Sequence, residues 1–160
     1  MGNRFMIRWK ISILYYWIAY FITLGVGVGH TFITAFFLKM KSVMPIEKLY
    51  ITAYNKTMPF HPLYTIVIWT LAAFFYFHIA KPSVNNKWKT ALFLGIGWTV
   101  ITIIFDMFAW VIIRHPWSMS WKDFYIDYQP WITLEYIAIL VSPYIGSIMY
   151  KNNKVKDKMS

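Results

Sequence analysis

Three ionisable side chains, His30, Asp106 and Glu135, lie inside long apolar runs of this sequence. His78 is the only other histidine, acidic or basic residue in these runs. An imidazole beside a carboxyl group can accept and donate a proton near neutral pH. We therefore predict that His30, Asp106 and Glu135 are catalytic residues, forming an acid/base set that acts on a lipid or isoprenoid substrate.

Two other interpretations of the same residues stay open. Histidine and carboxylate ligands suit zinc or another divalent ion, but the sequence has no HxxxH, HExxH or ExxH spacing and no cysteine. The groups could also hydrogen-bond to one another and set the register of the helices. Glycine-rich phosphate loops and serine nucleophile elbows are absent from the sequence as well. We therefore predict no metal and no cofactor.

The segment 114–131 combines aromatic, basic and acidic residues more densely than any other part of the sequence. A guanidinium group can hold a phosphate, while acidic and amide side chains supply polar contacts to a substrate headgroup. An aromatic membrane anchor is the alternative for this segment. The candidate substrate-binding residues are His61, Arg114, His115, Asp123, Asp127, Gln129 and Trp131.

The elements that position these residues are apolar runs. The composition is 59% hydrophobic and 14% charged, which excludes an ordinary soluble domain. The runs cover 11–38, 63–80, 90–113 and 131–150. Since lipid-exposed backbone must satisfy its own hydrogen bonds, each run is expected to form a helix. We predict a single membrane domain over 1–160, an all-α bundle of four transmembrane helices.

Three local patterns refine this bundle. Gly25 and Gly29 have the small-xxx-small spacing that indicates a tight helix contact. Apolar residues repeat at helical spacing over 44–55 and 120–129, which predicts two short interfacial helices in the outer loops. Ser120 and Asp123 have the spacing of a capping box at the start of the second.

The basic residues predict the orientation. Of the 16 Lys and Arg residues, ten lie before the first run, between the second and third runs, or in the tail 151–160, and six lie in the other two loops. The positive-inside rule then places both termini in the cytoplasm, in a multi-pass cell-membrane protein. His30, Asp106 and Glu135 would meet near the outer side, where we predict a polar pocket.

Such a pocket predicts a protein that binds a lipid-like or hydrophobic molecule. The enzymatic form of this hypothesis is that the protein also transforms the bound molecule. The alternative is a non-enzymatic accessory or immunity-type membrane protein, whose polar cluster is structural. A proton-coupled carrier is a third class, but four spans would need a dimer to enclose a pathway. The expected partners are membrane lipids, a hydrophobic small molecule, and a second copy or a larger membrane protein. The basic residues lie in the gaps between runs and do not predict nucleic-acid binding.

Overall fold

The computed structural model describes residues 7–41, 45–83, 86–115 and 118–150, and within these ranges the chain is helical and contains no strand. Four stretches are long and apolar enough to span a membrane, which confirms the predicted number: Trp9–Met40, Lys48–Ala80, Lys87–Ile112 and Trp131–Met149. The basic tail 151–160 lies outside the described residues. The elements, in order, are α1 (Trp9–Lys41), α2 (Ile46–Thr57), the 3-10 helix η1 (Met58–Phe60), α3 (His61–Ala80), α4 (Lys87–Asp106), the π-helices η3 (Met107–Ile112) and η4 (Asp123–Asp127), and α5 (Trp131–Met149).

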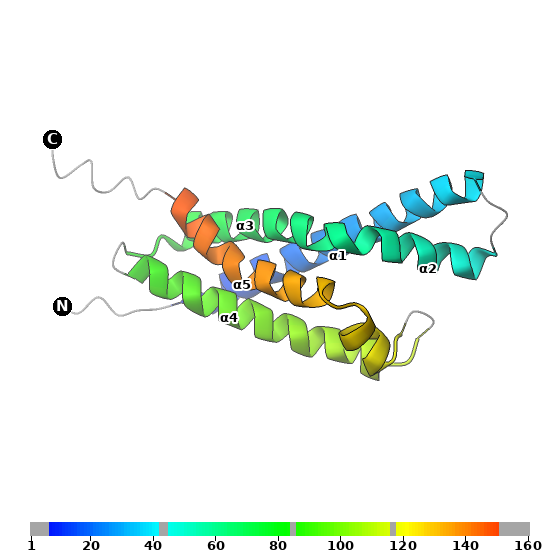
Figure 1. The fold of residues 1–160 in the computed structure, drawn as a ribbon. Helices are drawn as coiled ribbons and strands as arrows, with labels where there is room; N and C mark the ends of the chain where they lie inside the picture. The colour runs from blue at the N-terminus through cyan, green and yellow to red at the C-terminus, as the bar shows by residue number, and fades with distance from the viewer. Residues whose placement is uncertain (1–6, 42–44, 84–85, 116–117, 151–160) are drawn as a thin grey trace.

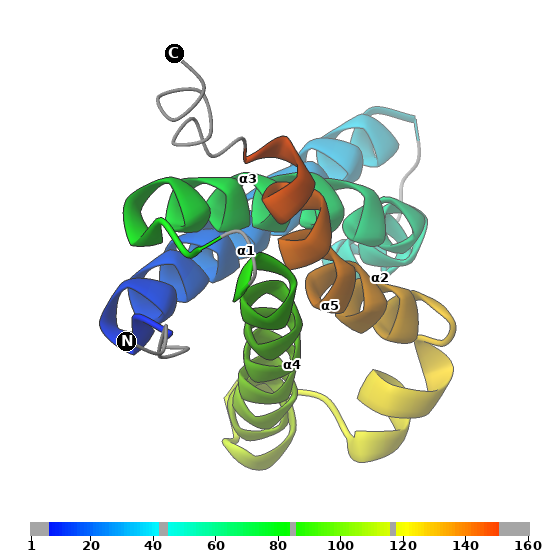
Figure 2. The same cartoon turned by 90° about the vertical axis from the view of Figure 1, so that its left-hand side faces the viewer.

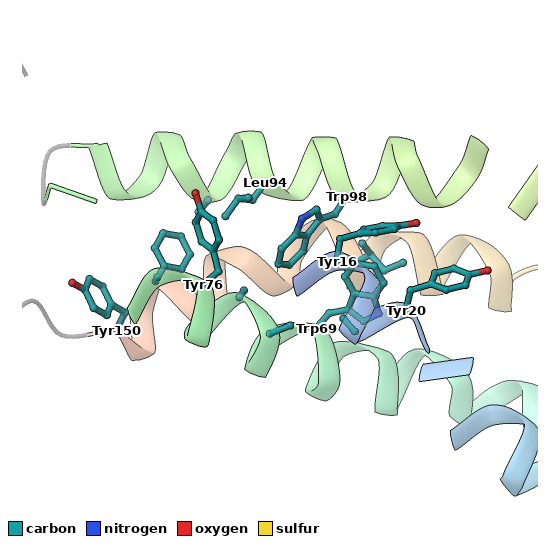
Figure 3. Packing of buried hydrophobic residues seen from close by; sticks show 13 residues of the cluster. Tyr16, Tyr20, Trp69, Tyr76, Leu94, Trp98 and Tyr150 are labelled. Carbon is teal, nitrogen blue, oxygen red and sulfur yellow. The ribbon is translucent and has the colours of Figure 1, made fainter. Parts of the chain in front are cut away.

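The four long apolar helices surround one aromatic core (Figures 1 and 2). The α3 helix packs against both α1 and α5, and α4 packs against α5. Tyr16, Trp69 and Trp98 meet edge to face in the middle of this core, with ring centroids 5.4 and 5.5 Å apart (Figure 3). Large apolar side chains of all four helices point outward, as they do in a bundle that faces lipid.

Two glycines set the closest helix contacts. A Cβ atom on Gly95 would clash with the carbonyl oxygen of Leu140, so α4 and α5 meet there backbone to backbone. A Cβ atom on Gly146 would lie 2.8 Å from that of Ala73 and from the Phe74 backbone nitrogen, so α5 also lies close to α3 there. The predicted contact at Gly25 and Gly29 does not occur within the described chain, because no described atom lies within 4 Å of a Cβ atom built on either residue.

The α2 helix leads through η1 directly into α3 and packs along the last turns of α1. Figure 1 shows this α1–α2 hairpin extending past the ends of α4 and α5. The first residues of a helix need no N–H partner, so Pro59 and Pro62 fit at the starts of η1 and α3. Because α2 packs on α1 and continues into α3, the structure does not support an interfacial helix over 44–55.

The capping box before η4 is confirmed. The Ser120 hydroxyl group accepts a hydrogen bond from the Asp123 N–H at 3.1 Å, and the Asp123 carboxylate accepts one from the Ser120 N–H at 3.2 Å. The Ser120 hydrogen bonds lower the pKa of the Asp123 carboxyl group below its ordinary value. The helical turns that follow are short, and Phe124 is buried against the protein. An interfacial position for 120–129 is not supported.

Candidate functional site

Side-chain hydrogen bonds join α1 to α4. The partners are spaced four residues apart on both helices, which run in the same direction. Because i and i+4 residues share one face of a helix, the bonds form a straight ladder through the apolar core. The rungs are Trp98 Nε1 to Ser12 Oγ at 3.0 Å, Thr102 Oγ1 to Tyr16 Oη at 3.3 Å and Tyr20 Oη to Asp106 Oδ1 at 2.8 Å.

Asp106 ends this ladder in a closed network. Its Oδ2 atom accepts a second hydrogen bond, from Tyr136 Oη on α5 at 3.2 Å. The π-helix η3 begins at the next residue and presents Trp110, whose Nε1 donates to Tyr20 Oη at 3.4 Å. The Asp106 side chain is only 7% exposed. Both carboxylate oxygens of Asp106 therefore have phenol donors, and the residue ties together α1, α4 and α5.

Glu135 has a more open environment near the start of α5. Its Oε1 atom accepts a hydrogen bond from Thr65 Oγ1 on α3 at 3.3 Å, and its Oε2 atom has no hydrogen-bond partner among the described residues. Glu135 is partly buried and interacts electrostatically with Asp106. Neither acid forms a salt bridge with any residue that the structure describes. Glu135 thus keeps a free acceptor in a region without a basic partner.

Two buried polar atoms at the start of α3 also lack partners among the described residues. They are His61 Nε2 and Tyr64 Oη, on the first turn of α3, and their rings lie 5.2 Å apart. Tyr64 interacts electrostatically with Glu135. The sequence places Tyr64 near a span end, and its buried hydroxyl group could not be recognised without the position of α1. His61 was predicted as a binding residue, and the structure brings it into this group.

His30 does not join either acid through a hydrogen bond in the described structure. Its ring packs edge to face against Phe60, with the centroids 5.4 Å apart, and it interacts electrostatically with His61. The predicted set of three residues is therefore divided. Asp106 belongs to the phenol network, Glu135 bonds to Thr65, and His30 lies in the neighbourhood of His61.

Two of the other predicted binding residues, His115 and Gln129, hold the connection between α4 and α5. The His115 Nε2 atom lies 2.7 Å from the carbonyl oxygen of Ala109. The Gln129 amide donates to the Tyr125 carbonyl oxygen at 3.1 Å and accepts from Thr133 at 2.7 Å. These contacts are local and hold the chain in place before α5.

Arg114 and Asp127 point into the surroundings of the protein, and Trp131 is partly buried where α5 begins. The same connection reaches the α1–α2 hairpin through Tyr128, whose ring meets that of Tyr54 edge to face at 5.1 Å. Tyr128 thus links the connection before α5 to the α1–α2 hairpin.

Metal binding has no support in the described part of the chain, where no three His, Asp or Glu residues are close enough to hold an ion. The phenol donors Tyr20 and Tyr136 were missed by the sequence analysis. The four-residue spacing of Ser12, Tyr16 and Tyr20 in an apolar run is the signal that could have indicated a polar face on α1. Comparisons of the chain with protein families, curated proteins and solved structures find no match.

Proposed function

We propose that this multi-pass membrane protein binds a lipid-like or other hydrophobic molecule at the group formed by His61, Tyr64, Thr65 and Glu135, which we name the Glu135 cluster. The supporting observation is that two buried polar atoms and one carboxylate oxygen of this cluster have no hydrogen-bond partner among the described residues. A buried polar atom without a partner costs about 1–3 kcal/mol. A ligand that supplies those hydrogen bonds recovers this free energy.

A second candidate function is a non-enzymatic accessory protein whose acids only hold the bundle together. The hydrogen bonds of Asp106 favour it, because both carboxylate oxygens are already used by Tyr20 and Tyr136. Polar side chains between membrane helices commonly act in this way. The two candidate functions make different demands on Glu135. The binding function needs its free acceptor oxygen, whereas the accessory function does not.

Glu135→Gln tests the binding function. In a thermal-shift measurement on the purified protein, a polar lipid extract is expected to stabilise the wild type. A ligand at 100 times its Kd contributes about 2.7 kcal/mol. Glu135→Gln keeps the side-chain volume but loses the charge, and it should weaken ligand binding roughly tenfold, equivalent to about 1.4 kcal/mol. The unliganded variant should be at least as stable as the wild type.

Asp106→Asn is the matched control, since it neutralises the other acid of the same bundle. It should keep the shift caused by the lipid extract. If no lipid fraction shifts the wild type and Glu135→Gln is clearly destabilised, the accessory function is correct and the binding function is rejected.

We also propose that both termini are cytoplasmic, so that the Glu135 cluster lies toward the outer side. The support is the excess of basic residues, ten against six, on the side of the termini. The chain has no cysteine, so single substitutions can report the topology. A membrane-impermeant maleimide should label Arg114→Cys in intact cells and Ser160→Cys only after lysis. The reverse pattern would show that the orientation is wrong.

A further inference from the structure

The two unpartnered atoms of the Glu135 cluster lie against one glycine of α1. A Cβ atom on Gly27 would be 3.0 Å from Tyr64 Oη and 3.7 Å from His61 Nε2. Gly27 is buried, whereas its neighbours in the same glycine series, Gly25 and Gly29, have nothing within 4 Å of such an atom. The absence of a side chain at position 27 therefore brings the backbone of α1 close to both polar atoms.

The chemistry around Gly27 restricts the group that could pair with these atoms. An imidazole nitrogen and a phenol oxygen can each donate or accept a hydrogen bond, and the nearby Glu135 Oε2 atom accepts one when ionised. The two acids have no salt-bridge partner in the described chain, so an anionic head would be repelled. An ammonium head would have to lose its hydration within the membrane, which is unfavourable. A hydroxyl group satisfies donor and acceptor together without a charge.

Exposed apolar side chains occur close to this position along the chain, in α1, η1 and α3. Val28 follows Gly27 on α1, Leu63 precedes Tyr64 on α3, and Phe60 packs against His30. These three apolar side chains are 46%, 62% and 50% exposed, on a surface that would face lipid. An acyl or prenyl chain can lie along them while its polar end reaches inward.

We propose that Gly27, His61 and Tyr64 form the head position of the ligand site and that it takes a hydroxyl group at the end of an apolar chain. This inference rests on the proposed binding function and specifies its ligand class. The hydroxyl group pairs with Tyr64 Oη and His61 Nε2, and the chain extends between α1 and α3 toward lipid.

Photolabelling of the purified full-length protein tests this assignment. The probes carry the same diazirine-bearing alkyl chain and end in a hydroxyl, an amine, a carboxylic acid or a methyl group. We expect saturable labelling by the alcohol, competed by unlabelled alcohol, with an apparent affinity at least roughly tenfold above that of the methyl-ended probe. The labelled peptides should come from α1 and α3.

Two variants locate the head position. Tyr64→Phe removes only an unpartnered hydroxyl group, so it should fold normally and weaken alcohol binding roughly tenfold. Gly27→Ala places a methyl group against Tyr64 Oη and should weaken binding similarly. Gly25→Ala and Gly29→Ala add the same methyl group on the same helix in open space, and they should bind the alcohol like the wild type.

The outcomes separate the inference from the function on which it rests. If no probe labels the protein saturably, the binding function itself is rejected. If the alcohol labels saturably but Tyr64→Phe and Gly27→Ala bind it normally, the function stands and the head position is wrong. Preference for the amine or acid probe, or equal labelling by the methyl-ended probe, would overturn the assignment of a hydroxyl ligand.

Discussion

Gly95→Ala is expected to destabilise the protein by about 3 kcal/mol, at the upper end of the usual effect of overpacking. The new Cβ atom would clash with the Leu140 carbonyl oxygen. Since that neighbour is backbone, it cannot rotate away, and α4 must separate from α5 along their contact. The free energy of unfolding in mixed detergent micelles, followed by circular dichroism, measures the loss.

Gly97→Ala provides the control on the same helix. Its Cβ atom would meet only the Trp9 ring, at 3.6 Å, which is an ordinary van der Waals distance. Alanine has the higher helix propensity, so this variant should be as stable as the wild type or slightly more stable. Equal stability of Gly95→Ala and Gly97→Ala would mean that the helices do not meet at Gly95.

Asp106→Leu is expected to lower the free energy of unfolding by about 1–3 kcal/mol, because the buried Tyr20 and the partly buried Tyr136 lose their acceptor. Tyr20 Oη and Tyr136 Oη would remain in the core with no carboxylate to receive their hydrogen bonds. Asp106→Asn keeps one carbonyl acceptor and should cost less than about 1 kcal/mol. The same unfolding measurement compares the two variants.

Tyr20→Phe provides the matching test from the donor side, and Tyr15→Phe is its control. Tyr15 lies on the same helix and forms no hydrogen bond in the described structure. The effects of Tyr20→Phe and Asp106→Leu should not add, since each removes the same contact. Additive losses, or an Asp106→Leu variant as stable as the wild type, would exclude a structural role for this network.

The contrast between the two acids connects stability to function. Asp106 has both oxygens engaged by phenols, while Glu135 has one hydrogen bond and lies near two unpartnered atoms. A buried carboxyl group with all its acceptors used stabilises a register of helices. A carboxyl group with an unused acceptor is available to a ligand. The two residues are alike in the sequence and differ in what they can do.

Local features of this protein follow from the sequence alone. Four apolar runs separated by polar segments predict four spanning helices, because helix formation in lipid depends mainly on the length and polarity of each run. The Ser120–Asp123 capping box is equally local, since its partners are three residues apart. The presence of Asp106 and Glu135 inside apolar runs also needs only the sequence.

The partners of those groups were decided by the tertiary structure. Gly95 and Gly25 look equivalent in the sequence, yet only Gly95 meets another helix. Tyr20, Tyr136 and Tyr64 were not predicted as partners or binding groups, because the rotation and register of each helix determine which phenol reaches an acid. Such contacts depend on residues far apart in the chain. The residue pattern within one run determines that a helix forms. The packing of several helices determines which polar side chains of that helix find a partner and which do not.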